Sequence, residues 1–165
     1  MTELVFAFGS NMCSGRLAAY EVTPLGARGA LLKRHKLSFR KRSQDGSGKA
    51  DVVPSRSRGA HVWGVLYEVD AQGLARLDDG EQGYQRRRAQ VLLRNGRRAR
   101  VWIYVSAPNQ RDESLHPYTW YKRFLVEGAK EHRLPKGYIA LLEGIIAIQD
   151  PNRKRDRRKR TLTCP

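Results

Sequence analysis

Two short segments carry side chains that could take part in chemistry. The first is Gly9-Ser10-Asn11, which follows an apolar run and offers backbone amides, a hydroxyl and a side-chain amide. Successive backbone N–H groups beside a glycine can form a concavity that binds a carboxylate or an oxyanion. The same composition is typical of an ordinary turn at the end of a strand. Taken alone, the segment is therefore either a binding loop or a simple turn.

The second segment is acidic and reads Leu-Asp-Asp-Gly-Glu-Gln-Gly-Tyr over residues 77–84. It carries Asp78, Asp79 and Glu81 between an expected helix and an expected strand. A carboxylate held at the end of an element near apolar neighbours has its pKa raised and can act as a base. The alternative is a solvated turn. A calcium loop is excluded because the required alternation of ligands is absent.

The cysteines and histidines show no pattern of metal ligation or of nucleophilic catalysis. Cys13 and Cys164 are far apart and no Cys-x-x-Cys pair is present. Cys13 would need a histidine or a cation to become a thiolate, and no histidine has a recognisable catalytic context. We therefore expect reduced thiols, no role for Cys13 in chemistry and no metal site.

The charge of the chain is strongly positive. It has 32 Lys and Arg against 16 Asp and Glu, a formal net charge of +16. Seven of these cations lie between Arg153 and Arg160, so we expect residues 151–165 to form a disordered basic tail with non-specific affinity for polyanions. Arg86–Arg88, beside Trp102 and Tyr104, could bind nucleic acid or simply form a solvated basic face.

Strand patterns dominate before residue 105 and helical patterns after residue 117, which predicts an α+β fold. The expected strands are 3–8, 31–42, 61–69, 84–94 and 97–105, and the expected helices are 71–79, 118–131 and one opening at Pro135. Residues 43–49 are expected to be loop. Asn95-Gly96 predicts a type I′ hairpin.

The length predicts one domain over residues 1–150 followed by the tail at 151–165. No secretory signal and no run of 18 apolar residues is visible, so we expect a cytoplasmic protein without a membrane span. The sequence leaves monomer and homodimer both open.

Three segments in the same order resemble the γ-glutamylcyclotransferase family. Phe6–Met12 (FAFGSNM) resembles the family's Tyr-Gly-Ser-Asn-Leu substrate loop. Residues 62–67 (VWGVLY) followed by 77–84 resemble its strand and acid-bearing segment, and residues 117–138 resemble its C-terminal helical stretch. The resemblance covers most of residues 4–150 but not the basic tail.

The resemblance implies a mixed, barrel-like sheet with flanking helices, and cleavage of a γ-glutamyl amide to 5-oxoproline and a free amine without a cofactor. By this resemblance Glu81 is the general acid/base. The residues matching those that contact the substrate are Phe8, Gly9, Ser10, Asn11, Tyr84 and Tyr121. The loop's usual tyrosine is Phe8 here, which removes a hydroxyl.

Two alternatives to this function remain at this stage. One is a non-catalytic basic module on the same fold that binds nucleic acid. The other stays within the same chemistry and removes a γ-glutamyl protecting group from a biosynthetic intermediate.

Overall fold

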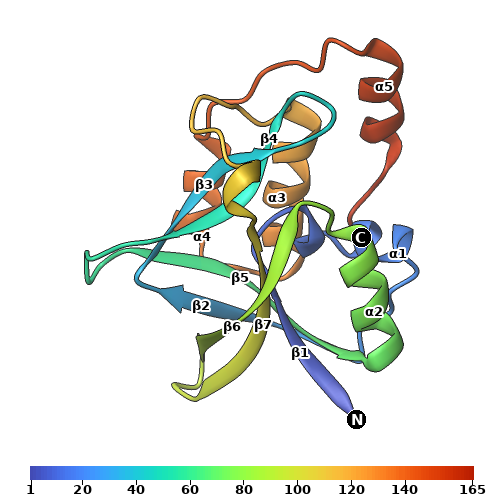
Figure 1. Cartoon of the computed structure of the whole chain (residues 1–165). Helices are drawn as coiled ribbons and strands as arrows, with labels where there is room; N and C mark the ends of the chain where they lie inside the picture. Colours follow the sequence, from blue (N-terminus) through green and yellow to red (C-terminus); the bar gives the residue numbers. More distant parts are fainter.

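Five strands close into a barrel in the order β1-β5-β2-β6-β7 (Figure 1). The computed structural model describes residues 1–165. The barrel strands are β1 (Thr2–Ala7), β5 (His61–Asp70), β2 (Gly26–Lys33), β6 (Tyr84–Leu93) and β7 (Arg98–Ser106). Neighbours pair antiparallel except β1 and β7, which pair parallel through Val5 and Trp102. The expected α+β class with a mixed, barrel-like sheet is confirmed.

The hairpin between β6 and β7 differs from the expected type I′ turn. Only Gly96 has a positive φ, at 82°. Its N–H donates to the Leu93 carbonyl at 3.0 Å, and the Leu93 N–H donates to the Arg97 carbonyl at 2.8 Å. Residues 94–96 therefore form a three-residue loop that ends on a left-handed glycine, the next commonest hairpin connection. The hairpin predicted from Asn95-Gly96 is present, but its loop has three residues instead of the two of a type I′ turn.

A two-stranded sheet lies beside the barrel and corrects two predictions. The expected strand 31–42 is two strands, β2 and β3 (His35–Arg42), because the chain turns at Arg34 with φ 57°. Part of the expected loop 43–49 belongs to β4 (Gly48–Pro54), which pairs antiparallel with β3. Strand β4 escaped prediction because its first residues follow a run of Ser, Asp and Gly that is typical of loops.

A buried carboxylate joins the two sheets. Asp51 on β4 is fully buried and accepts hydrogen bonds from the Ser106 N–H at 3.0 Å, the Ser106 hydroxyl at 2.5 Å and Arg40 Nε at 2.7 Å. Burial alone would raise the pKa of Asp51, but the hydrogen bonds from Ser106 and Arg40 outweigh it and lower that pKa. Asp51 therefore links β4 to β3 and to β7 as an anion.

The predicted helices are confirmed with small shifts, as α2 (Ala71–Gly80), α3 (Thr119–Glu131) and α4 (Lys136–Glu143). Asp70 caps α2 by accepting from the Gly73 N–H at 2.7 Å. Three short elements were not predicted: η1 (Ser10–Met12), α1 (Ser14–Ala19) and η2 (Pro108–Gln110). No helix is long and apolar enough to cross a membrane.

The basic C-terminal segment is ordered, so the expectation of a disordered tail is wrong. Residues Arg153–Thr161 form α5, capped by the Asn152 side chain. Arg155 makes two hydrogen bonds of 2.6 Å to the buried Asp150, and Arg160 pairs with Asp156 at 2.9 Å. The aspartate within the run and the one just before it offset part of the repulsion that favoured disorder.

The expectation of two reduced thiols is also wrong, because Cys13 and Cys164 form a disulfide. After α5 the chain runs back toward α1, and Arg123 on α3 donates to the carbonyls of Lys159 and Leu162. This path brings the two cysteine Cα atoms to 5.1 Å, within the range that a disulfide spans. In Figure 1 the C-terminus accordingly lies beside α1, far from α5 itself. Sequence separation alone could not reveal this pairing.

We expect Asp51→Asn to lower the free energy of unfolding by about 3 kcal/mol, since an amide cannot accept all three hydrogen bonds of the buried carboxylate and the ion pair with Arg40 is broken. Urea denaturation followed by circular dichroism measures the change. Asp112→Asn is the control, because Asp112 also pairs with an arginine on β3 but only at 3.5 Å and with partial exposure; it should change stability little. Equal effects of the two substitutions would contradict the role assigned to Asp51.

We expect reduction of the disulfide, or Cys164→Ser, to expose α5 to trypsin, which cleaves after Lys and Arg. The intact link should contribute about 2–4 kcal/mol to stability. Limited proteolysis with mass spectrometry would find faster cleavage between residues 153 and 160 in reduced wild type. In Cys164→Ser the rate should be fast and independent of reductant. An unchanged rate in both cases would show that the disulfide does not hold α5.

Candidate active site

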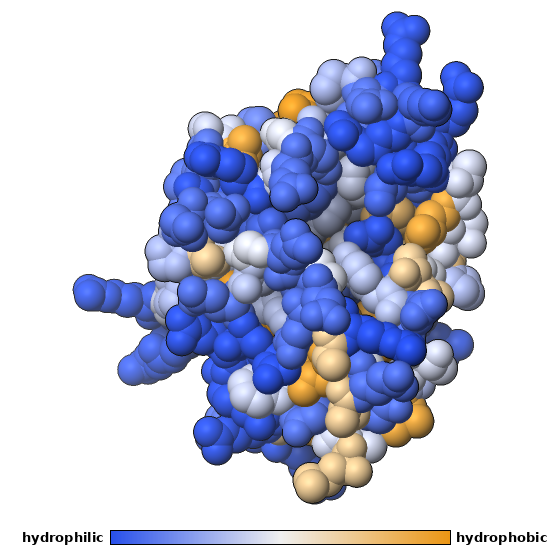
Figure 2. Space-filling view, turned by 45° about the vertical axis from the view of Figure 1, so that its right-hand side comes forward, coloured by the Kyte–Doolittle hydropathy of each residue, from blue (hydrophilic) through white to orange (hydrophobic).

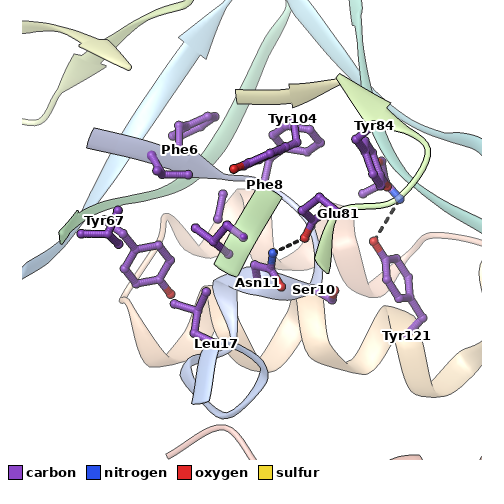
Figure 3. A pocket seen from close by; sticks show the side chains of 16 residues that line it. Phe6, Phe8, Ser10, Asn11, Leu17, Tyr67, Glu81, Tyr84, Tyr104 and Tyr121 are labelled. Carbon is purple, nitrogen blue, oxygen red and sulfur yellow. Dashed lines mark hydrogen bonds between the residues drawn. The ribbon is translucent and has the colours of Figure 1, made fainter. Parts of the chain in front are cut away.

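A narrow cavity of about 50 Å³ opens at the end of β1 (Figure 3). The seven site residues expected from the sequence all line it: Phe8, Gly9, Ser10, Asn11, Glu81, Tyr84 and Tyr121. They come from the loop after β1, the end of α2, the start of β6 and helix α3. The structure thus brings together side chains that are more than 100 residues apart in the chain.

The loop after β1 is held by close packing against α3. A Cβ on Gly128 would lie 2.6 Å from the Met12 backbone carbon, so only glycine lets α3 approach this closely. The hydroxyl of Tyr67 on β5 donates to the Met12 carbonyl at 3.0 Å. The Gly9 carbonyl accepts from the Met12 N–H, and the Gly9 N–H itself donates to no backbone carbonyl. The loop is therefore held in place, and the Gly9 N–H remains free beside the cavity.

Glu81 caps the C-terminal end of α2, where its N–H donates to the Leu77 carbonyl. Its carboxyl points toward the loop in Figure 3 and accepts from Asn11 Nδ2 at 2.5 Å. Burial raises the pKa of Glu81 above its ordinary value, and the Asn11 hydrogen bond offsets this only in part. Asn11 Oδ1 is buried without a hydrogen-bond partner. The pair thus presents a carboxyl of raised proton affinity beside a vacant acceptor.

Two tyrosines are fixed by one residue of β4. The Ala50 N–H donates to the Tyr121 hydroxyl at 3.0 Å, and the Tyr84 hydroxyl donates to the Ala50 carbonyl at 2.7 Å. Burial raises the pKa of Tyr121 to about 12, so its hydroxyl stays protonated at neutral pH. A Cβ on Gly9 would lie 3.1 Å from that hydroxyl. The Tyr121 hydroxyl therefore lies against the loop, where it accepts from Ala50 and has no acceptor of its own.

The apolar wall of the cavity was not predicted. It is formed by residues of β1 and β5 together with Leu17, Leu77 and Tyr104. Phe8 is 5% exposed and packs 6.3 Å from Phe6, ring centre to ring centre. An aromatic ring without a hydroxyl suits this environment. The alternation of apolar residues along the strands was visible in the sequence, but which face lines the cavity depends on barrel closure.

A wider cleft of about 500 Å³ adjoins the narrow cavity. Both are lined by Ser10, Glu81, Tyr84 and Tyr121. The cleft continues between the β3–β4 sheet, the end of α2 and helix α5. A ligand in the cleft can therefore reach Glu81 from that side and extend into the narrow cavity.

The arginine-rich hairpin does not present free aromatic rings. The Trp102 ring is covered by Arg86 and Arg88, whose guanidinium carbons are 4.5 and 3.4 Å from its centre, and its indole N–H donates to Glu3 at 2.8 Å. The Tyr104 hydroxyl donates to Asp78 at 2.8 Å. These contacts favour the solvated basic face over a stacking surface for nucleic acid.

Comparison with known proteins gives concordant results. Residues 61–142 match the AIG2-like family. The gamma-glutamylcyclotransferase of Mus musculus is 30% identical, over 87% of this chain and 79% of that protein, and that of Homo sapiens is 30% identical, over 86% and 78%. A solved structure of an uncharacterized Homo sapiens protein superposes with a TM-score of 0.77 at 28% identity, covering 88% and 89% of the two chains. A structure described as a gamma-glutamyl cyclotransferase shares the fold, with a TM-score of 0.83 at 24% identity over 98% and 99%.

We expect Glu81→Gln to stabilise the protein at pH 8. Folding raises the pKa of the Glu81 carboxyl, so the folded protein binds its proton more tightly than the unfolded chain does. The resulting stability is fully present below the unfolded pKa, and it is lost as the pH rises through the folded pKa. The glutamine keeps the shape and cannot ionise, so its advantage in Tm, about a few degrees, should disappear toward pH 4. Scanning calorimetry across pH measures this. The exposed neighbour Asp79, which has no ion-pair partner, gives the control Asp79→Asn; a similar pH-dependent gain there would contradict the assignment.

Proposed function

The chain belongs to the gamma-glutamylcyclotransferase family, and we propose that its cavity cleaves a γ-glutamyl amide by intramolecular cyclisation with Glu81 as general acid/base. The observation that carries this proposal is the meeting of Glu81 with the loop of residues 9–11 across one cavity, through the Asn11 hydrogen bond. A loop with a free amide and a carboxyl of raised pKa are the two groups that this chemistry requires.

In the proposed reaction the substrate's α-amino nitrogen attacks its own γ-carbonyl carbon. The new C–N bond closes a five-membered ring, the original amide C–N bond breaks, and the products are 5-oxoproline and a free amine. No water is consumed. Well-oriented intramolecular attack reaches effective molarities of about 10⁵–10⁸ M, so the main contribution of the protein is to fold the substrate into the reactive conformation.

Glu81 would move the proton. An α-amino group has a pKa of about 7.7–8.0 and is not nucleophilic while protonated. Burial raises the pKa of Glu81 and so brings it closer to that of the amine, which favours proton transfer between the two. After attack, the same carboxyl would return the proton to the leaving nitrogen. In this scheme Asn11 Oδ1, which is buried without a partner, would accept a hydrogen bond from the substrate's α-ammonium group.

Gly9 and the two tyrosines would bind the rest of the glutamyl group. The Gly9 N–H has no backbone acceptor and suits the substrate's α-carboxylate or the oxyanion that develops at the γ-carbon. Ser10, Tyr84 and Tyr121 lie where the cavity meets the cleft. Phe8 supplies an apolar surface in place of the family tyrosine. No hydrogen bond to substrate is assigned to it.

We expect Glu81→Gln to lower kcat for 5-oxoproline release at least about 10²-fold while KM changes little, because glutamine preserves the shape and cannot accept the proton. The assay follows 5-oxoproline from a set of γ-glutamyl amino acids and γ-glutamyl amines by liquid chromatography. Asp79→Asn serves as the matched control and should retain full activity.

Two outcomes would contradict this function. One is the absence of 5-oxoproline with every γ-glutamyl compound tested on folded wild-type protein. The other is full activity of Glu81→Gln, which would remove the carboxyl from the mechanism.

A further inference from the structure

The cleft beside Glu81 is lined by many more cationic than acidic side chains. Seven Lys and Arg side chains line it, against two acids, Asp45 and Glu81. Both acids already have partners: Asp45 pairs with Lys49 at 2.8 Å, and Glu81 binds Asn11. The cleft as a whole therefore carries an excess of positive charge that its own acids do not balance.

Three of the seven cations are neutralised by specific carboxylates. Lys49 pairs with Asp45, Arg155 with the buried Asp150, and Arg42 with Asp112 at 3.5 Å. The Arg155–Asp150 pair holds α5, and the Lys49–Asp45 pair holds the connection between β3 and β4; the longer, partly exposed Arg42–Asp112 pair is the weakest of the three. Their charges serve the fold and leave little for a ligand.

The other four cations, Arg16, Lys41, Arg158 and Lys159, form no ion pair with any residue. They come from α1, β3 and α5, elements far apart in the chain that all contribute to this cleft. Cations without partners repel one another, so surrounding a cleft with them costs stability unless something else compensates.

Lys41 shows this cost most clearly. It is only 8% exposed, its ammonium has no acceptor, and it lies 5.0 Å from the centre of the Tyr84 ring. A Cβ on Gly83, which has φ 79°, would lie 3.0 Å from its nitrogen, so a glycine leaves the space that it occupies. Burial lowers the pKa of this lysine. Its Nζ atom keeps contact with solvent in the cleft, so this lysine can bind an anion that enters there.

Arg16 and Lys159 are two further cations of the cleft that lie against aromatic rings and form no ion pair. The Nε of Arg16 is buried without a hydrogen-bond partner, and its guanidinium lies 5.4 Å from the Phe124 ring centre. Lys159 is half-buried and lies 5.2 Å from the Trp120 ring centre. Figure 2 shows the face toward α5 to be covered mainly by hydrophilic side chains. The rings position these cations without neutralising them.

We propose that the amine released from the γ-glutamyl substrate is itself polyanionic, carrying two or more negative charges as carboxylate or phosphate groups. The proposal rests on the function proposed above. The glutamyl end lies at Glu81, where cavity and cleft meet, and the amine end extends into the cleft among Arg16, Lys41, Arg158 and Lys159. The cleft of about 500 Å³ has room for such a group.

Matched pairs of substrates test the charge with little change in size. One pair is γ-glutamylglutamate against γ-glutamylglutamine, and the other is γ-glutamyl-O-phosphoserine against γ-glutamylserine. We expect kcat/KM to be at least about tenfold higher for the more anionic member, equivalent to about 1.4 kcal/mol, and the preference to fall as salt is added. The larger of the two ratios identifies carboxylate or phosphate as the preferred group.

Two double variants on α5 test the location. Arg158→Gln with Lys159→Gln removes two charges from the cleft and should reduce the preference for the anionic member about tenfold, mainly through KM. Arg153→Gln with Lys154→Gln removes the same charge from the same helix at exposed positions outside the cleft, and should leave the preference unchanged. On γ-glutamylserine the Arg153/Lys154 double variant should retain wild-type kcat/KM, whereas the Arg158/Lys159 double variant should lose less than it loses on γ-glutamyl-O-phosphoserine.

The outcomes separate this inference from the function on which it rests. Release of 5-oxoproline with equal kcat/KM within both pairs would overturn the inference and leave the function standing. An equal loss of preference in the two double variants would overturn the cleft as its location. If no γ-glutamyl compound reacts, both proposals fail together.

Discussion

The tyrosine side of the candidate site depends on the position of strand β4. Asp51, fully buried, binds Ser106 of β7 and Arg40 of β3, and the preceding residue, Ala50, binds Tyr84 and Tyr121 through its backbone. The Asp51 side chain anchors the strand. The backbone of the preceding residue, Ala50, is thereby held in the register that lets it bind both tyrosines. A shift of β4 by one residue would remove these contacts together. The hydrogen bonds of Asp51 to Ser106, which join the two sheets, thereby help to position two tyrosines that Asp51 does not touch.

The fold was predictable where one short-range pattern decides the structure. Alternation in residues 61–69 predicted strand β5, the glycine at position 96 predicted the hairpin, and the helical spacing after residue 118 predicted α3. Prediction failed where distant residues decide. The strand expected over residues 31–42 is interrupted at Arg34, a non-glycine residue with φ 57°, which no local signal indicates. Gly48–Pro54 is a strand because it pairs with β3 and because Asp51 binds β7. Helix α5 needs Asp150 and Asp156 to offset its cations, and the Cys13–Cys164 pair depends on the path of the last residues.

The candidate site was predictable through its polar residues and not through its surroundings. Gly9, Ser10, Asn11 and Glu81 carry chemical signals that a sequence shows directly. Ala50 carries none, because its contribution comes from its backbone. Lys41 and Lys159 were visible only as parts of a general basic character, since which cations of a basic chain line one cleft depends on tertiary structure. The polar core of a site can therefore be found from sequence, whereas the residues that shape its electrostatics need coordinates.

The place of Glu81 at the end of α2 has a consequence of its own. Aligned peptide dipoles give the C-terminal end of a helix a partial negative charge, which opposes a second negative charge there. Glu81 caps that end of α2, so the helix that delivers the carboxyl also increases its affinity for a proton, in the same direction as burial. This contribution resides in the main chain. It persists through side-chain substitutions around Glu81 as long as α2 still ends at Gly80.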